Sequence, residues 1–249
     1  MTSERATPAP SAPRDYFATT RWTLVLAAGR RGSPQADLAL EELCHVYWYP
    51  LYAYVRQHGH SREDAEDLTQ AFFARVLEKN YLEGLRSEKG KFRAFLLTAL
   101  KHFLANEWDR GSRQKRGGGV ARLSLDWQSA DTRYHIDPAD RLSPDKLYDR
   151  AWAVTLLERV IARLREECER EGKAKLFKQL KPFLMLGKSA IPYGEAAAAL
   201  ELSEGAARVA VHRLRRQYRE LLREEIGQTL SNVADVEEEM RALFSAFSD

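Results

Sequence analysis

Five arginines and no acidic residue lie between Gly205 and Arg219, in a segment whose apolar residues recur at helical spacing. Guanidinium groups on one helix face can bind the phosphates of nucleic acid and the edges of bases in a major groove. The apolar stripe that would face the core consists of Ala207, Val211, Leu214, Tyr218 and Leu221. The other side of the helix would carry Arg208, His212, Arg215, Arg216 and Arg219. The unbroken positive charge favours a DNA-reading helix over the alternative, an arginine-rich face that is only solvated.

A shorter, alanine-rich helix precedes this one. It begins near Tyr193 and ends near Leu200, and Ser203 can cap the helix that follows. The short turn between them gives the pair helix-turn-helix proportions. The small residues at 205–207 would let the second helix enter a major groove. Four side chains would then reach base edges or phosphates: Arg208, Val209, His212 and Arg213.

Residues 61–77 predict a helix with one acidic face, and Ser61 with Asp64 makes a capping-box-like start. The core stripe of this helix is Ala65, Leu68, Phe72 and Val76. The remaining face carries Glu63, Glu66, Asp67 and Gln70. This face could be solvated, since the helix dipole favours carboxylates there, could dock a basic or polar partner helix, or could hold a metal ion. The metal alternative lacks a second acidic cluster or histidine to complete its ligands.

Residues 92–110 predict a helix with an aromatic side chain on a polar face. The predicted apolar arc is Leu97, Leu100, Leu104 and Trp108. The other side carries Phe95, Thr98, His102 and Asn106. A ring beside Lys101 could stack on an unpaired base, which supplies about 1–3 kcal/mol per base. The alternative is that Phe95 packs against the preceding loop at 86–91.

The periodicity predicts an all-α protein of two small helical domains, because alternating strand patterns and tight hairpin turns are absent. Gly111–Arg122 holds four basic residues and no acidic one, and opens a basic, glycine-rich linker. Cations of this linker that could hold phosphates are Arg113, Lys115 and Arg116. We expect a disordered leader at 1–18, helical domains at 19–110 and 149–223 joined by the linker at 111–148, and an acidic extension at 224–249.

Composition excludes several classes of protein. The 249 residues are 44% hydrophobic and 30% charged, as in a folded chain, with a formal net charge of only +3. Two distant cysteines exclude a disulfide scaffold and a zinc finger, and fit a reducing cytosol. The apolar runs are too short to span a bilayer. Gly187-Lys188-Ser189 imitates a phosphate loop, but Pro182 stands where its first glycine must be. We therefore expect no enzyme activity, cofactor or metal.

The C-terminal extension carries seven acidic residues and one arginine from Glu224 to Asp249, a net charge of −6. Asp235 with Glu238 can cap a short helix. The apolar stripe of this helix would be Val236, Met240, Leu243 and Phe247. We expect the helix to dock on the second domain and to mask the arginine face in the free protein.

Taken in order along the chain, these motifs resemble the two domains of a bacterial sigma factor of the extracytoplasmic-function type, in the sigma-70 family. The motifs that carry the likeness are Asp64–Gln70 followed by Phe72 and Phe73, Phe92–Leu96, Asn106–Arg110 and the helix-turn-helix. The likeness covers residues 38–110 and 150–222. It implies a promoter-specificity subunit that binds core RNA polymerase, reads the minus-ten and minus-thirty-five elements and helps to open the duplex.

The resemblance also assigns residues to each contact. The surface for the clamp helices of the largest polymerase subunit would comprise Asp64, Glu66, Asp67, Leu68, Gln70 and Phe73. Contacts to the minus-ten element would come from Arg93, Phe95, Lys101, His102, Asn106 and Arg110. Contacts to the minus-thirty-five element would come from Ser203, Arg208, Val209, His212, Arg213 and Arg216. The linker would run through the polymerase channel, and Glu201 stands where the family usually has glycine in the turn.

Two other functions are compatible with these residues. A stand-alone helix-turn-helix regulator would bind duplex DNA without polymerase, but it would leave the acidic face and Phe95 without a task. A metal-dependent nuclease using Asp64, Glu66 and Asp67 would require cleavage that depends on a divalent ion. We expect a cytoplasmic protein without membrane insertion, open to regulation by an anti-sigma protein, by phosphorylation or by its own extension.

Overall fold

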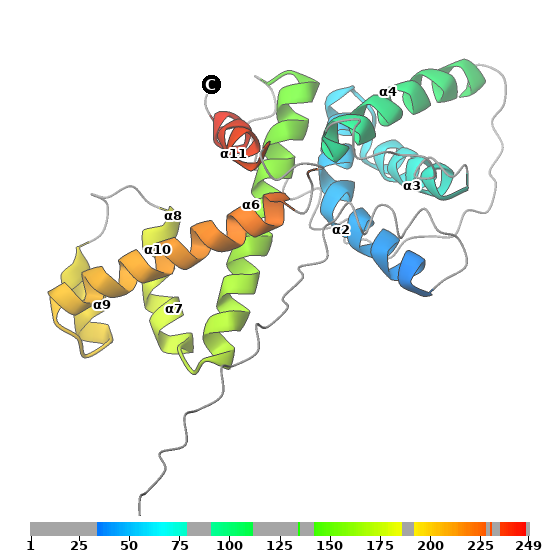
Figure 1. The fold of residues 1–249 in the computed structure, drawn as a ribbon. Helices are drawn as coiled ribbons and strands as arrows, with labels where there is room; N and C mark the ends of the chain where they lie inside the picture. Colours follow the sequence, from blue (N-terminus) through cyan, green and yellow to red (C-terminus); the bar gives the residue numbers. More distant parts are fainter. Residues whose placement is uncertain are drawn as a thin grey trace, which may run out of the picture.

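The computed structural model describes residues 34–78, 91–111, 134, 142–185, 192–227, 230 and 235–247. Regular secondary structure in these ranges is entirely helical, which confirms the predicted all-α class (Figure 1). The helices are α2 (Pro34–Gln57), α3 (Arg62–Glu78), α4 (Phe92–Gly111), α6 (Pro144–Arg170), α7 (Ala174–Leu180), α8 (Pro182–Met185), α9 (Tyr193–Ala199), α10 (Glu204–Gly227) and α11 (Val236–Ser245). The predicted leader at 1–18 lies outside the described residues.

Helix α2 is the centre of the first helical group. Every residue from Cys44 to Val55 except His45 is buried. A helix that is apolar around its whole circumference must be covered on several sides. Helices α3, α4 and α6 all pack against it, and Tyr47 meets the ring of Phe92 in α4 edge-on, with ring centroids 5.3 Å apart.

Helices α3 and α4 follow from local signals. The Ser61 hydroxyl accepts a hydrogen bond from the backbone N–H of Asp64 at 3.1 Å and donates one to its carboxylate at 2.9 Å, which confirms the predicted start of α3. The predicted core stripe of α3 is confirmed as well. Helix α4 instead buries Phe92, Leu96, Leu100 and Phe103. The predicted apolar arc of α4 was therefore wrong in part, because Leu97 and Leu104 are only half-buried and lie at the margin of the core.

Helix α6 runs between the two helical groups (Figure 1). Its start is specified by Ser143, whose hydroxyl accepts a hydrogen bond from the backbone N–H of Lys146 at 3.3 Å, and by Pro144, whose missing N–H costs nothing in a first turn. The predicted end of the linker at 148 therefore falls inside α6. This helix packs against α2 on one side and α10 on the other, so one continuous core joins the two groups.

Helices α7 to α10 form the second group. Lys181 alone separates α7 from α8, which begins at Pro182. Helix α9 ends at Ala199, with Leu200 as its C-cap. Helix α10 crosses α6, and an ion pair of 2.7 Å between Arg163 of α6 and Glu224 of α10 links the two. The group thus presents the N-terminal end of α10 at the far end of the molecule from α3 and α4 (Figure 1).

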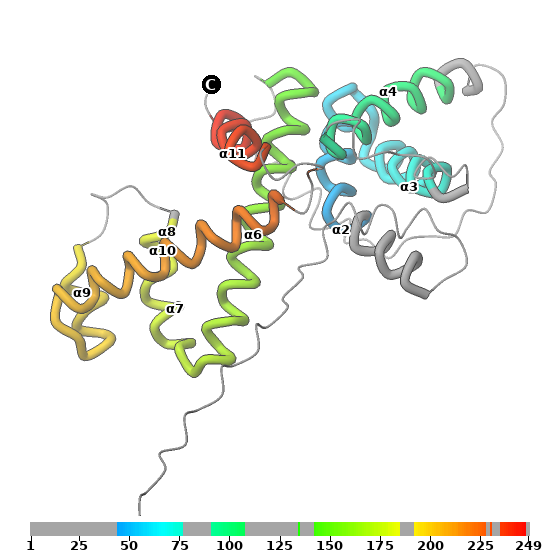
Figure 2. Tube along the Cα trace, viewed as in Figure 1, coloured from blue at the N-terminus to red at the C-terminus, as the bar shows by residue number. Residues whose placement is uncertain are grey.

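The C-terminal extension forms helix α11, which packs against α6 and α10 (Figure 2). Val236, Met240 and Leu243 are buried, whereas Phe247 is 39% exposed. Asp235 occupies the N-cap position but its side chain makes no capping hydrogen bond, so the predicted capping pair with Glu238 was wrong. In the described parts of the chain, no helix combines the length and the apolar character needed to cross a membrane.

Candidate nucleic-acid interface

The start of α10 presents a positive, solvent-exposed face. The Ser203 hydroxyl accepts a hydrogen bond from the backbone N–H of Ala206 at 3.2 Å, so this residue caps the helix as predicted. The predicted buried stripe is also observed, with Tyr218 as its one half-buried member. The residues predicted to reach DNA are all exposed: Arg208, Val209, His212, Arg213 and Arg216. Val209 is 51% exposed, and a bare β-branched side chain among cations suits contact with a thymine methyl group.

Aromatic packing holds this end of the helix in place. The Arg208 guanidinium lies 5.3 Å from the centroid of the Tyr193 ring, which itself stacks on Phe183 at 5.0 Å. Arg215 has a different role from its neighbours. Its guanidinium donates two hydrogen bonds, of 3.0 and 2.7 Å, to the backbone carbonyl of Phe183. Arg215 therefore ties α10 to α8, and the prediction that it belongs to the exposed arginine face was wrong.

The turn between α9 and α10 contains backbone that an L-residue rarely adopts. Glu201 has a φ of 57° and follows Leu200, the C-cap of α9. The backbone N–H of Leu202 bonds to the carbonyl of Ala197 at 2.9 Å, and that of Glu201 bonds to Ala198 at 3.1 Å. This is a helix end that glycine usually completes. The positive φ at position 201 explains why glycine is expected there and why Glu201 is a departure.

The face of α3 predicted to dock a partner is exposed at its start. Asp64 and Asp67 are exposed, and Glu66 is half-buried and bonded to Arg62 at 2.9 Å. Leu68 and Gln70 are half-buried beside them. Among the described residues, no group of three or more metal-ligating side chains occurs.

Phe73 does not belong to that face. Only 3% of it is exposed, and its ring lies 5.8 Å from the ring of Phe72 within the core. Two adjacent aromatic residues on a helix can both be buried where helices cover it on two sides. The prediction that Phe73 contacts polymerase was therefore wrong for this structure.

The polar face of α4 is exposed at Thr98, His102 and Asn106. The Asn106 amide donates a hydrogen bond to the backbone carbonyl of His102 at 2.8 Å, so it is held against its own helix. Phe95 is half-buried and stacks on Phe92, with centroids 6.1 Å apart and planes 24° apart. Phe95 therefore packs at the edge of the core with part of its ring exposed, and an exposed aromatic ring can stack on an unpaired base.

Two cations predicted to contact the minus-ten element are bonded to acidic residues instead. Only 15% of the Arg93 side chain is exposed, and it pairs with Asp149 and Glu239. Lys101 pairs with Asp145 at 2.8 Å. Arg93 is therefore not open to DNA in this arrangement, whereas Lys101 keeps 42% of its side chain exposed. The side chain of Arg110 and the linker cations Arg113, Lys115 and Arg116 lie outside the described residues.

The acidic extension docks at a place the sequence did not predict. Helix α11 does pack on the second group, but its contact with α10 is an ion pair of 2.9 Å between Glu237 and Arg223, well beyond the exposed arginines at the other end of α10. The prediction that it masks that arginine face was wrong. One signal could have indicated the true contact: Glu239 lies on the same helical stripe as Val236, Met240 and Leu243, where an acid needs a cationic partner.

Comparison with protein families identifies the first helical group. The family model for sigma-70 region 2 matches residues 48–114, which run from the middle of α2 to just beyond the end of α4. Comparison with curated proteins and with solved structures gave no match. The matched segment contains the exposed acidic face of α3 and the polar face of α4.

Proposed function

Because residues 48–114 make this chain a member of the sigma-70 family, with a role in promoter recognition and transcription initiation, we propose that it is a sigma factor of the extracytoplasmic-function type. In this proposal it binds core RNA polymerase, directs it to promoters through the minus-thirty-five and minus-ten elements, and helps to open the DNA. Bond formation belongs to the polymerase, and the cytoplasm is where the two would meet. The observation that carries the proposal is one region 2 domain combined with a separate, exposed arginine helix.

The acidic face of α3 is the proposed site for the clamp helices of the largest polymerase subunit. Asp64 and Asp67 are exposed near the start of α3, and Glu66 and Gln70 flank them. Leu68 adds a half-buried apolar contact at the edge. Exposed carboxylates of this kind speed and orient association with a basic or polar partner helix, which gives the face a function that solvation alone does not.

The N-terminal half of α10 is the proposed reader of the minus-thirty-five element. Ser203 and Arg208 stand at the entry to the groove, with Val209, His212 and Arg213 along the next turn and Arg216 toward the backbone. Their exposure leaves them available to phosphates and base edges. Arg215, which is bonded within the protein, is not included.

The exposed side of α4 is the proposed minus-ten face. Phe95 would stack on an unpaired base, and His102 and Asn106 lie further along the same helix, followed by Arg110. The linker cations would hold nucleic-acid phosphates between the two DNA elements, as their charge suggests. The boundaries of the two domains and of the linker remain predictions.

Co-elution with bacterial core RNA polymerase tests the proposal. We expect a stoichiometric complex with the wild-type chain that is lost on the double reversal Asp64→Lys and Asp67→Lys. A matched control reverses Glu166 and Glu169, two exposed acids at the same spacing on α6. Loss of binding in both double variants would point to net charge rather than to the α3 face.

The stand-alone regulator is the second candidate, favoured by the exposure of Arg208, His212, Arg213 and Arg216 on α10 in the free chain. It predicts tight binding of duplex DNA by the protein alone and no complex with core polymerase. That pair of results would replace the sigma-factor proposal.

A further inference from the structure

The buried carboxylate of α11 is bonded to two cations at the start of the region 2 helix α4. Glu239 is 1% exposed, and its Oε1 accepts a hydrogen bond from Arg93 Nε at 2.5 Å. Its Oε2 lies 2.7 Å from Lys91 Nζ. Glu238, one residue earlier, adds a contact of 3.0 Å to the same ammonium group. Helix α11, which packs against α6 and α10, thus also binds the first helical group at the start of α4.

Helix α6 holds the same end of α4 from another side. Its Asp149 carboxylate pairs with the Arg93 guanidinium, which lies 4.7 Å from the centroid of the Trp152 ring. The Tyr148 hydroxyl donates a hydrogen bond to the backbone carbonyl of Arg93 at 2.9 Å. Earlier in α6, Asp145 pairs with Lys101. We call the three acids that hold Lys91 and Arg93, Asp149 of α6 with Glu238 and Glu239 of α11, the acidic clamp.

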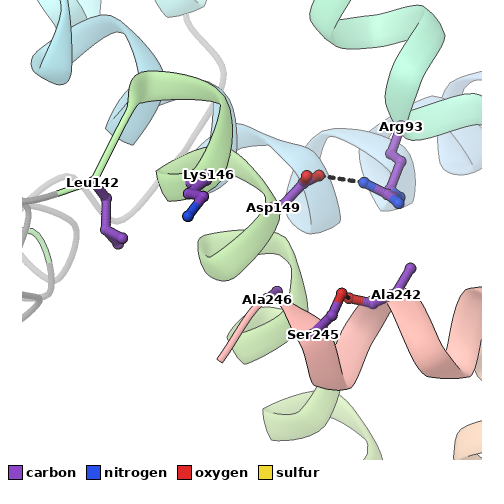
Figure 3. Close-up of a pocket in the computed structure, with 7 residues that line it drawn as sticks. All are labelled: Arg93, Leu142, Lys146, Asp149, Ala242, Ser245 and Ala246. Atoms are coloured by element: carbon purple, nitrogen blue, oxygen red, sulfur yellow. Dashed lines mark hydrogen bonds and ion pairs between the residues drawn. The ribbon is translucent and has the colours of Figure 1, made fainter. Parts of the chain in front are cut away.

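The acidic clamp borders a cavity, so one side of it is open. A cavity of about 200 Å³ lies between the start of α6 and the end of α11. Arg93, Lys146 and Asp149 line it together with Ala242 and Ser245 of α11, and Figure 3 shows the Arg93–Asp149 pair at its rim. Close packing is therefore incomplete beside the clamp, although displacing α11 still exposes Val236, Met240 and Leu243, which are buried in the shared core.

Helix α11 is also short enough to be released. It has 10 residues, below the length at which an isolated helix is stable in water, so its order depends on docking. A buried carboxylate needs cationic partners, whereas lysine and arginine can donate their hydrogen bonds to a phosphate instead of a carboxylate. The phosphates of DNA can therefore compete with Glu239 for Lys91 and Arg93.

We propose that the acidic clamp is an autoinhibitory contact, which keeps Lys91 and Arg93 from nucleic acid in the free chain and opens when α11 is displaced. This inference rests on the proposed minus-ten face of α4. It assigns the acidic extension to region 2 rather than to the arginine helix, which is left exposed. Nucleic acid or polymerase that displaces α11 would gain Lys91 and the side of Arg93 that Glu239 occupies, while Asp149 of α6 stays beside Arg93.

The full-length Glu239→Gln variant tests the clamp, with Glu237→Gln as the matched control. Both remove one charge from α11 with little change in shape, but Glu237 contacts Arg223 of α10 in an exposed ion pair, which contributes little. Two quantities are compared with wild type: hydrogen exchange of α11 and of residues 91–96, and affinity for a fluorescein-labelled single-stranded DNA of mixed sequence.

We expect faster exchange of both segments and tighter DNA binding in Glu239→Gln alone. A closed state that holds about 90% of the molecules lowers apparent affinity about tenfold, so opening it raises affinity by up to that factor. Equal exchange in all three proteins would overturn the clamp, and so would faster exchange with unchanged affinity. Core-polymerase co-elution is read separately: a wild-type chain that fails to bind polymerase sinks the proposed function, while the exchange and DNA data still decide the clamp.

Discussion

Helices α4 and α10 both carry cations predicted to bind DNA, yet the structure treats them differently. On α10, Arg208 and Arg216 form ion pairs with acids four positions away on the same helix and keep 65% and 76% of their side chains exposed. On α4, Arg93 pairs with acids 56 and 146 positions away in the sequence, and Lys101 with one 44 positions away. One set is presented to solvent and the other is held by the protein itself.

This difference shows what a charge pattern alone can establish. A run of arginines whose nearest acids, Glu204 and Glu220, lie one turn away on the same helix predicts an exposed face, because such ion pairs form at the helix surface. It carries no information about acids brought in by distant helices. The arginine helix is therefore ready to bind DNA in the free chain, whereas the region 2 face requires a change of partner.

The largest expected effect is on the stability of the core beneath Arg93, at the start of α4. Trp152 is 1% exposed and lies under the Arg93 guanidinium. We expect Trp152→Ala to lower the free energy of unfolding by about 3–5 kcal/mol, through lost burial and the cavity left behind. Urea unfolding measures this. Val209→Ala, at an exposed site on α10, should change it by less than about 0.5 kcal/mol. Similar losses in both variants would mean that α6 does not anchor α4.

The next effect separates two arginines on α10. Arg213→Ala should weaken promoter binding by the holoenzyme by about 1–3 kcal/mol if the guanidinium contacts a base, with little change in melting temperature. Arg215→Ala should do the opposite, because it removes the two hydrogen bonds to Phe183. Its expected cost is about 1–3 kcal/mol of stability. Promoter affinity and Tm are measured on both. Unchanged affinity in Arg213→Ala would remove that residue from the interface.

The acidic clamp should respond to pH in one direction. Burial alone would raise the pKa of Glu239, but its hydrogen bonds and the charges of Arg93 and Lys91 outweigh burial and hold the pKa below its ordinary 4.5. Burial, partly offset by Arg93, raises the pKa of Asp149, the acid that faces the pair from α6. Stability from Glu239 is thus complete above its ordinary pKa and is lost as pH falls through the lowered value. Protonation of Asp149 at milder acidity does not oppose docking.

We therefore expect α11 to stay docked down to about pH 4.5 and to be released below it. The methyl NMR signal of Met240, which is buried on the docked face of α11, reports the release. In Glu239→Gln this acid-dependent step should disappear. A step of the same size in that variant would assign the titration to another group.

Much of the fold and part of the candidate site follow from local sequence. Ser61 and Ser203 cap their helices as predicted, because an N-cap depends on residues within one turn. The exposed arginines of α10 follow from helical periodicity in the same way. These features need no knowledge of how the helices pack.

Apart from the missing cap at Asp235, the features that the sequence did not predict depend on long-range packing. Phe73 and Phe72 are adjacent aromatic residues, and only the position of the surrounding helices decides that both are buried. Arg215 was assigned to the exposed face because its partner, the carbonyl of Phe183, is a backbone atom 32 positions away. The acid on the apolar stripe of α11, Glu239, indicates that this helix docks beside cations. It does not indicate that these cations are Lys91 and Arg93 of α4.

The smallest expected effect concerns the turn that orients the arginine helix. Glu201 holds a left-handed conformation, with φ of 57°, that costs an L-residue about 1–2 kcal/mol. Glycine adopts it freely but loses more entropy on folding, so we expect Glu201→Gly to raise stability by about 0.5–1 kcal/mol. Its ion pair with Lys175, at 3.9 Å, is exposed and contributes little. Glu201→Gln removes that charge but keeps the backbone cost, and should leave stability unchanged in urea unfolding. If glutamine stabilises as much as glycine does, charge rather than backbone conformation sets the cost of this turn.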